Sequence, residues 1–238
     1  MNSYAESFLE LIYPEKNTCF ICETYDEKIN DKYICSDCEK KIKKIIHPAC
    51  SKCCKPIDFD SFDGLCRECR NSDRYFETSR SPYAYEGIIK KAIYSYKYYN
   101  KSYFFKFFGN CLVDYMKDTN YAYFDFIASV PIHPSKMRKR GYNQSELIAR
   151  YIASRLCIPY VDALKRTKKT LKQSGQKKED RRKNLRNAFT VKKSAQKIIN
   201  STILLVDDIY TTGSTVDECS KALIKYGAEK VYIITIAR

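Results

Sequence analysis

The sequence predicts an α/β fold in which helices flank a parallel sheet, preceded by a small cysteine-rich module that binds zinc. Three observations lead to this prediction. Cysteine pairs recur between residues 19 and 69. An unbroken apolar run at 203–206 is typical of a strand that is covered on both faces. Apolar residues at helical spacing follow that run, and a further apolar strand is expected at 230–236.

The composition allows one full domain and a small module. The chain has 238 residues and 44% hydrophobic content, which is enough to bury a sizeable core. No apolar run approaches the roughly 20 residues needed to span a membrane. Residues 1–16 also lack a basic region followed by an apolar core. We therefore expect a cytoplasmic protein without a transmembrane segment.

The cysteines form two copies of the pattern C-x2-C-x12-C-x2-C. Each copy has the ligand count of a tetrahedral four-cysteine site, so we expect two structural zinc ions. The expected ligands are Cys19, Cys22, Cys35, Cys38, Cys50, Cys53, Cys66 and Cys69. Disulfides are the weaker alternative, because cytoplasmic thiols stay reduced. Spacing alone allows sequential or interleaved pairing, and a helical pattern at 37–46 favours sequential pairing.

The cysteines stop near residue 71, where the aromatic content rises. We place a domain boundary there, with a zinc-binding module at 1–78 and an α/β domain at 79–238. Residue patterns then predict a strand at 81–85, helices at 87–98 and 102–117, a strand at 123–130 and a helix at 145–156.

A basic stretch, MRKRGYNQ at 137–144, follows the strand at 123–130 and a tight loop. Its positive charges suit a polyanion such as pyrophosphate, and Gly141 gives the stretch mobility. We expect Lys136, Arg138 and Arg140 to help bind that anion.

The net charge of +15 comes from one segment. Residues 133–200 hold 20 Lys and Arg against 4 Asp and Glu, whereas the remainder holds 23 against 24. Such a segment suits a polyanion, and a solvated charged face is the alternative. The side chains that we expect to bind nucleic acid are Lys97, Lys139, Lys168, Lys169, Lys177, Lys178, Arg181 and Arg182.

The stretch TILLVDDIYTTGST at 202–215 predicts a buried strand, two acids and a phosphate-sized turn that opens a helix. Since carboxylates would repel a phosphate, Asp207 and Asp208 should hold something else, such as ribose hydroxyls or hydrated Mg2+. A P-loop is excluded because G-x-x-x-x-G-K-[ST] does not occur. An ordinary strand end followed by an ordinary helix cap is the plainer alternative.

The stretch VDDIYTTGST resembles the signature of the type I phosphoribosyltransferases, which bind 5-phosphoribosyl-1-pyrophosphate (PRPP). The resemblance implies that Asp207 and Asp208 hold the ribose hydroxyls. It also implies that the 5′-phosphate lies in a loop formed by Thr211, Thr212, Gly213, Ser214 and Thr215. Purine-specific members carry an Asp at the position of Thr211, so this chain departs from them and a purine acceptor is disfavoured.

The stretch RKRGYNQ resembles the R-x-R-G-[FY]-N-Q signature of the ComF family, bacterial proteins of natural transformation, and the cysteine-rich N-terminus agrees with it. This resemblance covers essentially the whole chain. It implies a type I phosphoribosyltransferase-like domain, a link to single-stranded DNA, and partners such as a competence helicase or other DNA-uptake proteins.

Two functions therefore remain open. The first is a transferase that uses PRPP with Mg2+, with Asp207, Asp208, Arg138 and Arg140 as the catalytic residues and an unknown acceptor. The second is a single-stranded DNA-binding competence factor whose PRPP site is regulatory or vestigial.

Overall fold

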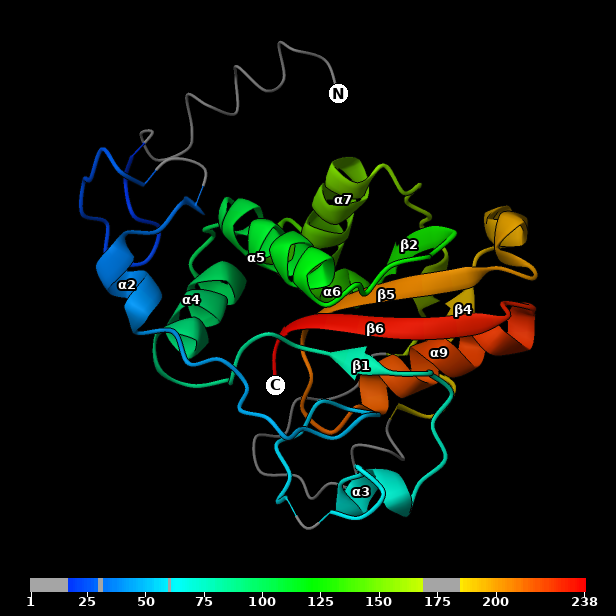
Figure 1. The fold of residues 1–238 in the computed structure, drawn as a ribbon. Helices are drawn as coiled ribbons and strands as arrows, with labels where there is room; N and C mark the ends of the chain where they lie inside the picture. The colour runs from blue at the N-terminus through cyan, green and yellow to red at the C-terminus, as the bar shows by residue number, and fades with distance from the viewer. Residues whose placement is uncertain (1–16, 30–31, 60, 169–184) are drawn as a thin grey trace.

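A computed structural model describes residues 17–29, 32–59, 61–168 and 185–238. Its central sheet has the strand order β1-β6-β5-β2, and every neighbouring pair is parallel (Figure 1). The four strands are β1 (Ser79–Arg80), β2 (Phe126–Ser129), β5 (Thr202–Ile209) and β6 (Lys230–Ala237). The predicted parallel sheet is confirmed.

One face of the sheet carries helices α4 (Gly87–Tyr98), α5 (Phe104–Asp118) and α7 (Gln144–Leu156) (Figure 1). The other face carries α9 (Ser214–Tyr226) and a small antiparallel sheet of β3 (Leu164–Arg166) and β4 (Phe189–Val191). The alternate residues of β5 supply both layers, because side chains along a strand point to opposite faces. Leu204 and Val206 belong to the first core, and Ile203 and Leu205 to the second.

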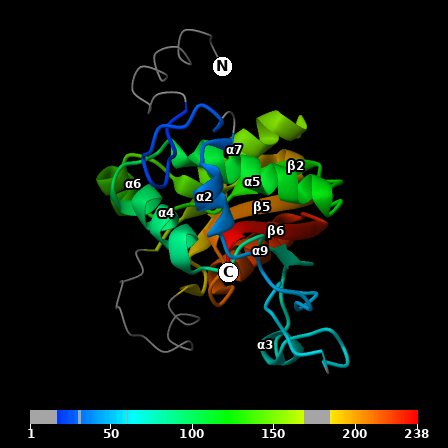
Figure 2. The ribbon, with the colours of Figure 1, turned by 60° about the vertical axis from the view of Figure 1, so that its left-hand side comes forward.

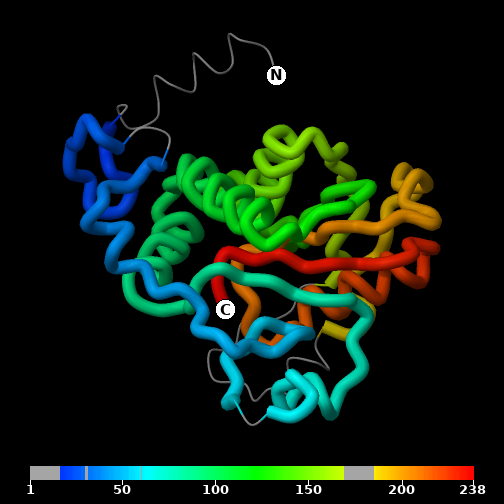
Figure 3. Tube along the Cα trace, viewed as in Figure 1, coloured from blue at the N-terminus to red at the C-terminus, as the bar shows by residue number. Residues whose placement is uncertain are grey.

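The two cysteine modules lie on opposite sides of this sheet, as Figures 2 and 3 show. The first, with helix α2 (Ser36–Lys40), packs into the core formed by α4, α5 and α7. The second, with helix α3 (Arg67–Arg70), packs into the core that contains α9. Helix α2 is shorter than the helical pattern at 37–46 predicts.

Two local predictions are wrong. The strand expected at 81–85 lies two residues earlier, at β1, because Pro82 has no N–H to offer a sheet and only Tyr83 bridges to Ala237. The tight loop expected before MRKRGYNQ is a short helix, α6 (Pro134–Arg140). Pro134 starts it, and Gly141 ends it with a φ of 81°.

The remaining described helical segment is the 3-10 helix η2 (Lys193–Ile198). Within the described ranges, every helix is too short or too polar to cross a membrane.

Candidate functional site

The candidate site lies where β5 ends, at the carboxyl edge of the sheet. Ligands of open α/β sheets bind in this position, because the loops after the strands form a crevice there. Strand β5 runs between β6 and β2, so Asp207 and Asp208 stand near the middle of that edge. The loop after them leads into α9.

Asp207 is held by hydrogen bonds from two directions. The Ser145 hydroxyl donates to its Oδ1 at 2.9 Å, and the Asp208 backbone N–H donates to the same oxygen at 2.9 Å. Burial, together with the charge of Asp208, raises the pKa of Asp207 to about 7. The two acids therefore form a partly buried pair in which the ionisation of one opposes that of the other.

Lys97, from the last turn of α4, neutralises the second acid. Its Nζ lies 2.8 Å from Asp208 Oδ1, and the two side chains are 18% and 15% exposed. The sequence predicts a role in nucleic-acid binding for Lys97, and that role stays a prediction. In the structure its ammonium group lies next to the pair of aspartates, a position that no sequence pattern predicts.

The loop at 211–215 forms a tight turn at the N-terminus of α9. Gly213 has a φ of 75°, a conformation that glycine tolerates best. A Cβ at Gly213 would lie 2.2 Å from the Tyr210 hydroxyl oxygen, so the loop rests directly on that ring. The hydroxyls of Thr212 and Ser214 lie 2.9 Å apart, whereas Thr211 is exposed. The turn and the start of α9 together offer N–H groups to an anion.

The basic stretch borders the same edge through α6 and the start of α7. Arg140 Nη1 donates a hydrogen bond to Gln144 Oε1, and the Arg140 guanidinium lies 5.4 Å from the centre of the Tyr98 ring. Arg138 and Lys139 are exposed, and Lys136 is partly buried. Positive charge thus stands beside the acid pair.

Two side-chain amide groups in this stretch each have one atom that is buried without a hydrogen-bond partner among the described residues. Asn143 Nδ2 donates to the Val130 carbonyl at 3.1 Å, whereas Asn143 Oδ1 and Gln144 Nε2 are buried and have no hydrogen-bond partner among the described residues. Buried polar atoms are seldom left unpaired, because each costs free energy. The start of α7 is therefore suited to contact a polar ligand or water.

A small cavity of about 340 Å3 opens beside the loop. Its wall is formed on one side by Lys55 and Glu68 of the second cysteine module. On the other side it is formed by Ile209, Thr211 and Arg238. Its size suits a small molecule. It adjoins Thr211, the position at which purine-specific enzymes carry their acid.

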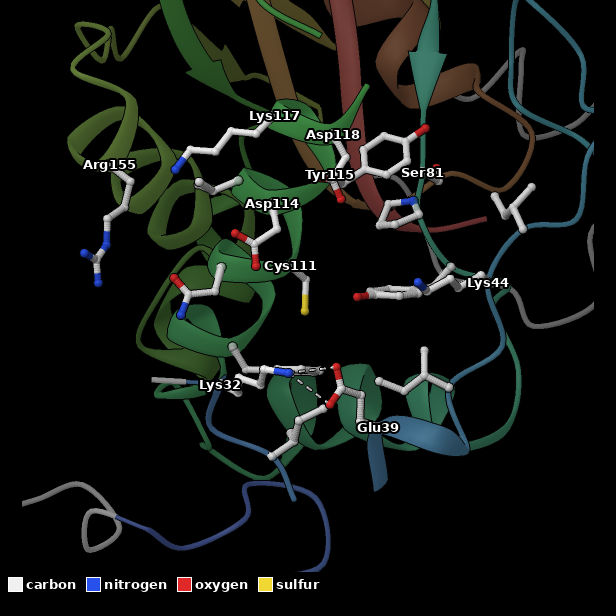
Figure 4. A pocket seen from close by; sticks show the side chains of 18 of the residues that line it. Lys32, Glu39, Lys44, Ser81, Cys111, Asp114, Tyr115, Lys117, Asp118 and Arg155 are labelled. Carbon is white, nitrogen blue, oxygen red and sulfur yellow. Dashed lines mark hydrogen bonds and ion pairs between the residues drawn. The ribbon is translucent and has the colours of Figure 1, made fainter. Parts of the chain in front are cut away.

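A larger cavity, of about 820 Å3, lies elsewhere, between the first cysteine module and α5 (Figure 4). Its lining mixes opposite charges, including the exposed ion pair of Lys32 with Glu39. Residues 202–215 and 136–144 do not line it. We locate the functional site at the end of β5 instead, because the convergent polar groups are there.

The eight cysteines form two sequential sets, as predicted. The sulfurs of Cys19, Cys22, Cys35 and Cys38 lie within 4.8 Å of one another, and so do those of Cys50, Cys53, Cys66 and Cys69. Zinc–sulfur bonds of about 2.3 Å would put the sulfurs of a tetrahedral site about 3.8 Å apart. Cys22 and Cys35 are 3.7 Å apart, and Cys53 and Cys66 are 3.6 Å apart, so both sets fit zinc. With four thiolates at each site, the expected role is structural.

Of the side chains expected to bind nucleic acid, the structure describes Lys97, Lys139 and Lys168. Lys139 is exposed on α6, and Lys168 donates to the Arg186 carbonyl at 3.1 Å. Lys169, Lys177, Lys178, Arg181 and Arg182 lie outside the described residues.

Three residues near the site had no signal in the sequence. Ser145 follows the basic signature directly, yet only the structure pairs it with Asp207. Arg238 lies over the Tyr210 ring at 4.6 Å and donates to the Cys53 carbonyl. Arg74 donates to the Thr212 carbonyl at 3.3 Å. These contacts join residues far apart in the chain, so no local pattern marks them.

Comparison with known proteins agrees with both halves of the structure. Residues 8–70 match the double zinc ribbon domain, and residues 143–238 match the phosphoribosyl transferase domain. These matches confirm the expected zinc module and the phosphoribosyltransferase-like sheet. We call the two cysteine modules the first ribbon (17–46) and the second ribbon (49–70).

Curated relatives extend over most of the chain. It is 30% identical over 210 residues to competence protein F of Haemophilus influenzae. This match covers 86% of this chain and 90% of that protein. It is 27% identical over 218 residues to competence protein ComFC of Bacillus subtilis, covering 87% and 85%. It is also 35% identical over 115 residues to the DNA utilization protein YhgH of Escherichia coli K12, covering 48% and 49%. The chain carries both domains, and it is 30% identical to competence protein F over 90% of the length of that protein. The chain therefore belongs to the ComF family.

Proposed function

We propose that this protein binds PRPP with Mg2+ at the end of β5 and transfers the phosphoribosyl group to an acceptor, in the handling of DNA during natural transformation. The observation that carries the proposal is the convergence of three groups at one sheet edge. These groups are the acid pair, the loop at the start of α9, and the basic stretch of α6 and α7. The names of the relatives, which speak of competence and DNA utilization, support the biological setting.

In this proposal each group holds one part of PRPP. Asp207 and Asp208 accept hydrogen bonds from the ribose hydroxyls, and residues 211–215 surround the 5′-phosphate. Arg138 and Arg140 face the pyrophosphate, with Lys136 nearby. Mg2+, whose preferred ligands are oxygens, would supply positive charge that stabilises the leaving pyrophosphate.

The transfer itself needs little covalent chemistry from the protein. The acceptor atom forms a bond to C1 of the ribose with its own electron pair, as the bond from C1 to the pyrophosphate oxygen breaks and that pair leaves with pyrophosphate. A proton lost by the acceptor passes to water. The arginines stabilise the charge that develops on the leaving group. We place the acceptor in the cavity of about 340 Å3 between Thr211 and the second ribbon.

Pyrophosphate release tests this function. Wild-type protein is incubated with PRPP, Mg2+ and one candidate acceptor at a time, and released pyrophosphate is measured beside an Asp207→Asn/Asp208→Asn control. Acceptor-dependent release that the control lacks would establish a transferase. If PRPP binds but no acceptor in a broad panel produces release, turnover is contradicted and a PRPP-binding DNA factor is favoured.

The second candidate function is binding of single-stranded DNA in the cytoplasm, with PRPP as a regulator. It is favoured by the excess of positive charge in residues 133–200, where 20 basic residues face 4 acidic ones. Affinity that depends on these charges should fall steeply between about 50 and 200 mM salt. Charge reversal at Lys177, Lys178 and Arg181 should flatten that slope. DNA binding that changes with neither salt nor these substitutions would rule out the segment as the binding site.

A further inference from the structure

Arg74 is a buried arginine that neither the motifs nor the family signatures mark. It lies in the short segment that leads from α3 of the second ribbon to β1, on the side of the sheet that carries α9 (Figure 1). Its side chain is only 2% exposed. Removing a guanidinium from water is costly unless other groups compensate, so a buried arginine calls for a specific role.

The hydrogen bond and the ion pair described for Arg74 lead to the loop at 211–215 and to the first turn of α9. Nη2 donates to the Thr212 carbonyl at 3.3 Å. Nη1 lies 3.6 Å from Asp217 Oδ2, and the neighbouring Tyr75 N–H donates to Asp217 Oδ1 at 2.9 Å. Within the described ranges, Nε and Nη1 form no hydrogen bond. The guanidinium thus has spare hydrogen-bonding capacity beside a helix N-terminus.

The bond to Thr212 fixes the direction of a peptide group. In a planar trans peptide the C=O and the following N–H point in opposite directions. Because Arg74 holds the Thr212 carbonyl on its own side, the N–H of Gly213 is directed to the other side of the loop. Gly213 adopts a φ of 75° there, which helps the turn to close into a nest of N–H groups.

The contact with Asp217 reduces the repulsion between this carboxylate and a phosphate bound at the loop. Asp217 lies in the first turn of α9, where its charge would stabilise the bare helix but repel a bound phosphate. Arg74 is a buried positive charge, 3.6 Å away, that offsets it. Both contacts therefore favour an anion at the same place.

We propose that Arg74 is a positioning residue for a sugar 5′-phosphate bound by residues 211–215, and that through it the segment after the second ribbon controls phosphate affinity. The inference rests on the proposed function, since it takes the loop to be the 5′-phosphate site. It adds that a residue outside the phosphoribosyl transferase match, which spans 143–238, helps to make that site.

The test compares two ligands that occupy different halves of the site. Ribose 5-phosphate, and separately pyrophosphate with Mg2+, are titrated calorimetrically into wild type, Arg74→Met, Arg74→Lys and Arg70→Met. Arg70 is the matched control, because this arginine lies only four residues earlier, at the end of α3, and pairs with Asp63 at the surface, 2.7 Å away. Circular dichroism and zinc content verify folding.

We expect Arg74→Met to weaken ribose 5-phosphate binding about tenfold or more, which corresponds to the loss of one interaction with a charged group. Pyrophosphate affinity should stay within about twofold, and Arg74→Lys should recover part of the loss by restoring the charge. Arg70→Met should match wild type. Unchanged ribose 5-phosphate binding in Arg74→Met would overturn the inference, and so would an equal loss for both ligands, which would indicate a general structural role.

A second variant keeps the test decisive if Arg74→Met does not fold. Asp217→Asn removes the opposing charge and retains an oxygen for the Tyr75 N–H. We expect it to bind ribose 5-phosphate at least as tightly as wild type, and a tenfold loss would overturn the inference. Failure of the proposed function looks different, because wild-type protein itself would then bind neither ribose 5-phosphate nor PRPP.

Discussion

The two zinc ribbons have the same cysteine spacing but stand in different relations to the candidate site. The first packs on α4 and α5, where Phe20 contacts Tyr103 with ring centres 4.7 Å apart and Glu23 pairs with Lys101. It therefore reaches the acid pair only indirectly, through α4 and Lys97. The second ribbon lies next to the loop at 211–215, through Arg238, Tyr210 and the segment that carries Arg74.

This difference indicates that a repeated sequence module need not have a repeated role. Zinc supplies folding free energy to both ribbons, since neither is large enough to build much core alone. What each ribbon then does depends on the surface that it covers. We interpret the first as a support for the helical layer and the second as part of the wall of the ligand site.

Arg238 donates a hydrogen bond to the Cys53 carbonyl, at the edge of the second cysteine cluster. Arg238 thus contacts both the cysteine cluster and the ring under Gly213, and it provides one physical connection between the second ribbon and the loop.

The largest effect should come from breaking one ribbon at a time. Cys38→Ser and Cys69→Ser remove the last cysteine of each set and should each lower the zinc content from two ions to one. We expect Cys69→Ser to weaken PRPP binding by more than about tenfold, because the loop loses its support, and Cys38→Ser to weaken it by less than about threefold. Calorimetry and metal analysis provide the measurements. Equal losses in the two variants would remove the distinction between the ribbons.

A change within the loop sharpens the same comparison. In Gly213→Ala the new Cβ would lie 2.2 Å from the Tyr210 hydroxyl, at a φ of 75° that costs alanine about 1 kcal/mol. We expect ribose 5-phosphate binding to fall at least tenfold. Gly141→Ala is the matched control, because its φ of 81° is similarly left-handed but no atom lies within 4 Å of the new Cβ. Similar ribose 5-phosphate affinities in the two variants would show that the fit on Tyr210 is unimportant.

The side of the sheet that carries the first ribbon is tested through Lys97. Lys97→Met leaves Asp208 without its ion pair and makes the acid pair more repulsive to the anionic PRPP, so PRPP affinity should fall roughly three- to tenfold. Lys91→Met, at an exposed position of the same helix, is the control. Single-stranded DNA is titrated in parallel. A loss confined to DNA binding would restore the nucleic-acid role predicted for Lys97 and contradict the role at Asp208.

The last prediction concerns the pH dependence of stability at Asp207. Its pKa of about 7 in the folded protein lies above the ordinary value of 3.8. The folded state therefore holds a proton that the unfolded chain loses, and the stabilisation present below about pH 4 disappears as the pH rises through about 7. Asp207→Asn lacks this titration. Thermal unfolding should show the stability of this variant, relative to wild type, increasing from pH 5 to pH 8, and a constant difference would contradict the shift.

The sequence predicts those parts of the molecule that depend on local patterns. The run at 203–206 and the helical spacing after it correctly predict β5 and α9, and helix α4 has the predicted bounds. The cysteine spacing predicts both zinc sites, because each needs four thiolates at short separations.

Other features depend on contacts between distant residues and escape such patterns. Helix α6 was missed because its basic residues suggested a loop, although Pro134 and Gly141 are ordinary helix signals. Lys97 and Arg74 could not have been assigned to the site, since their partners Asp208 and Thr212 lie more than a hundred residues away in the chain. Only the folded sheet brings them together.

The central claim, that the end of β5 is a PRPP site, is tested most directly by calorimetric titration of PRPP with Mg2+ into wild type and Asp207→Asn/Asp208→Asn. We expect the wild type to bind and the variant to lose about a hundredfold in affinity or more, because two carboxylates that accept ribose hydroxyls are gone. Its zinc content and circular dichroism should match wild type. Absence of PRPP binding in the wild type, or equally tight binding in a correctly folded variant, would contradict the claim.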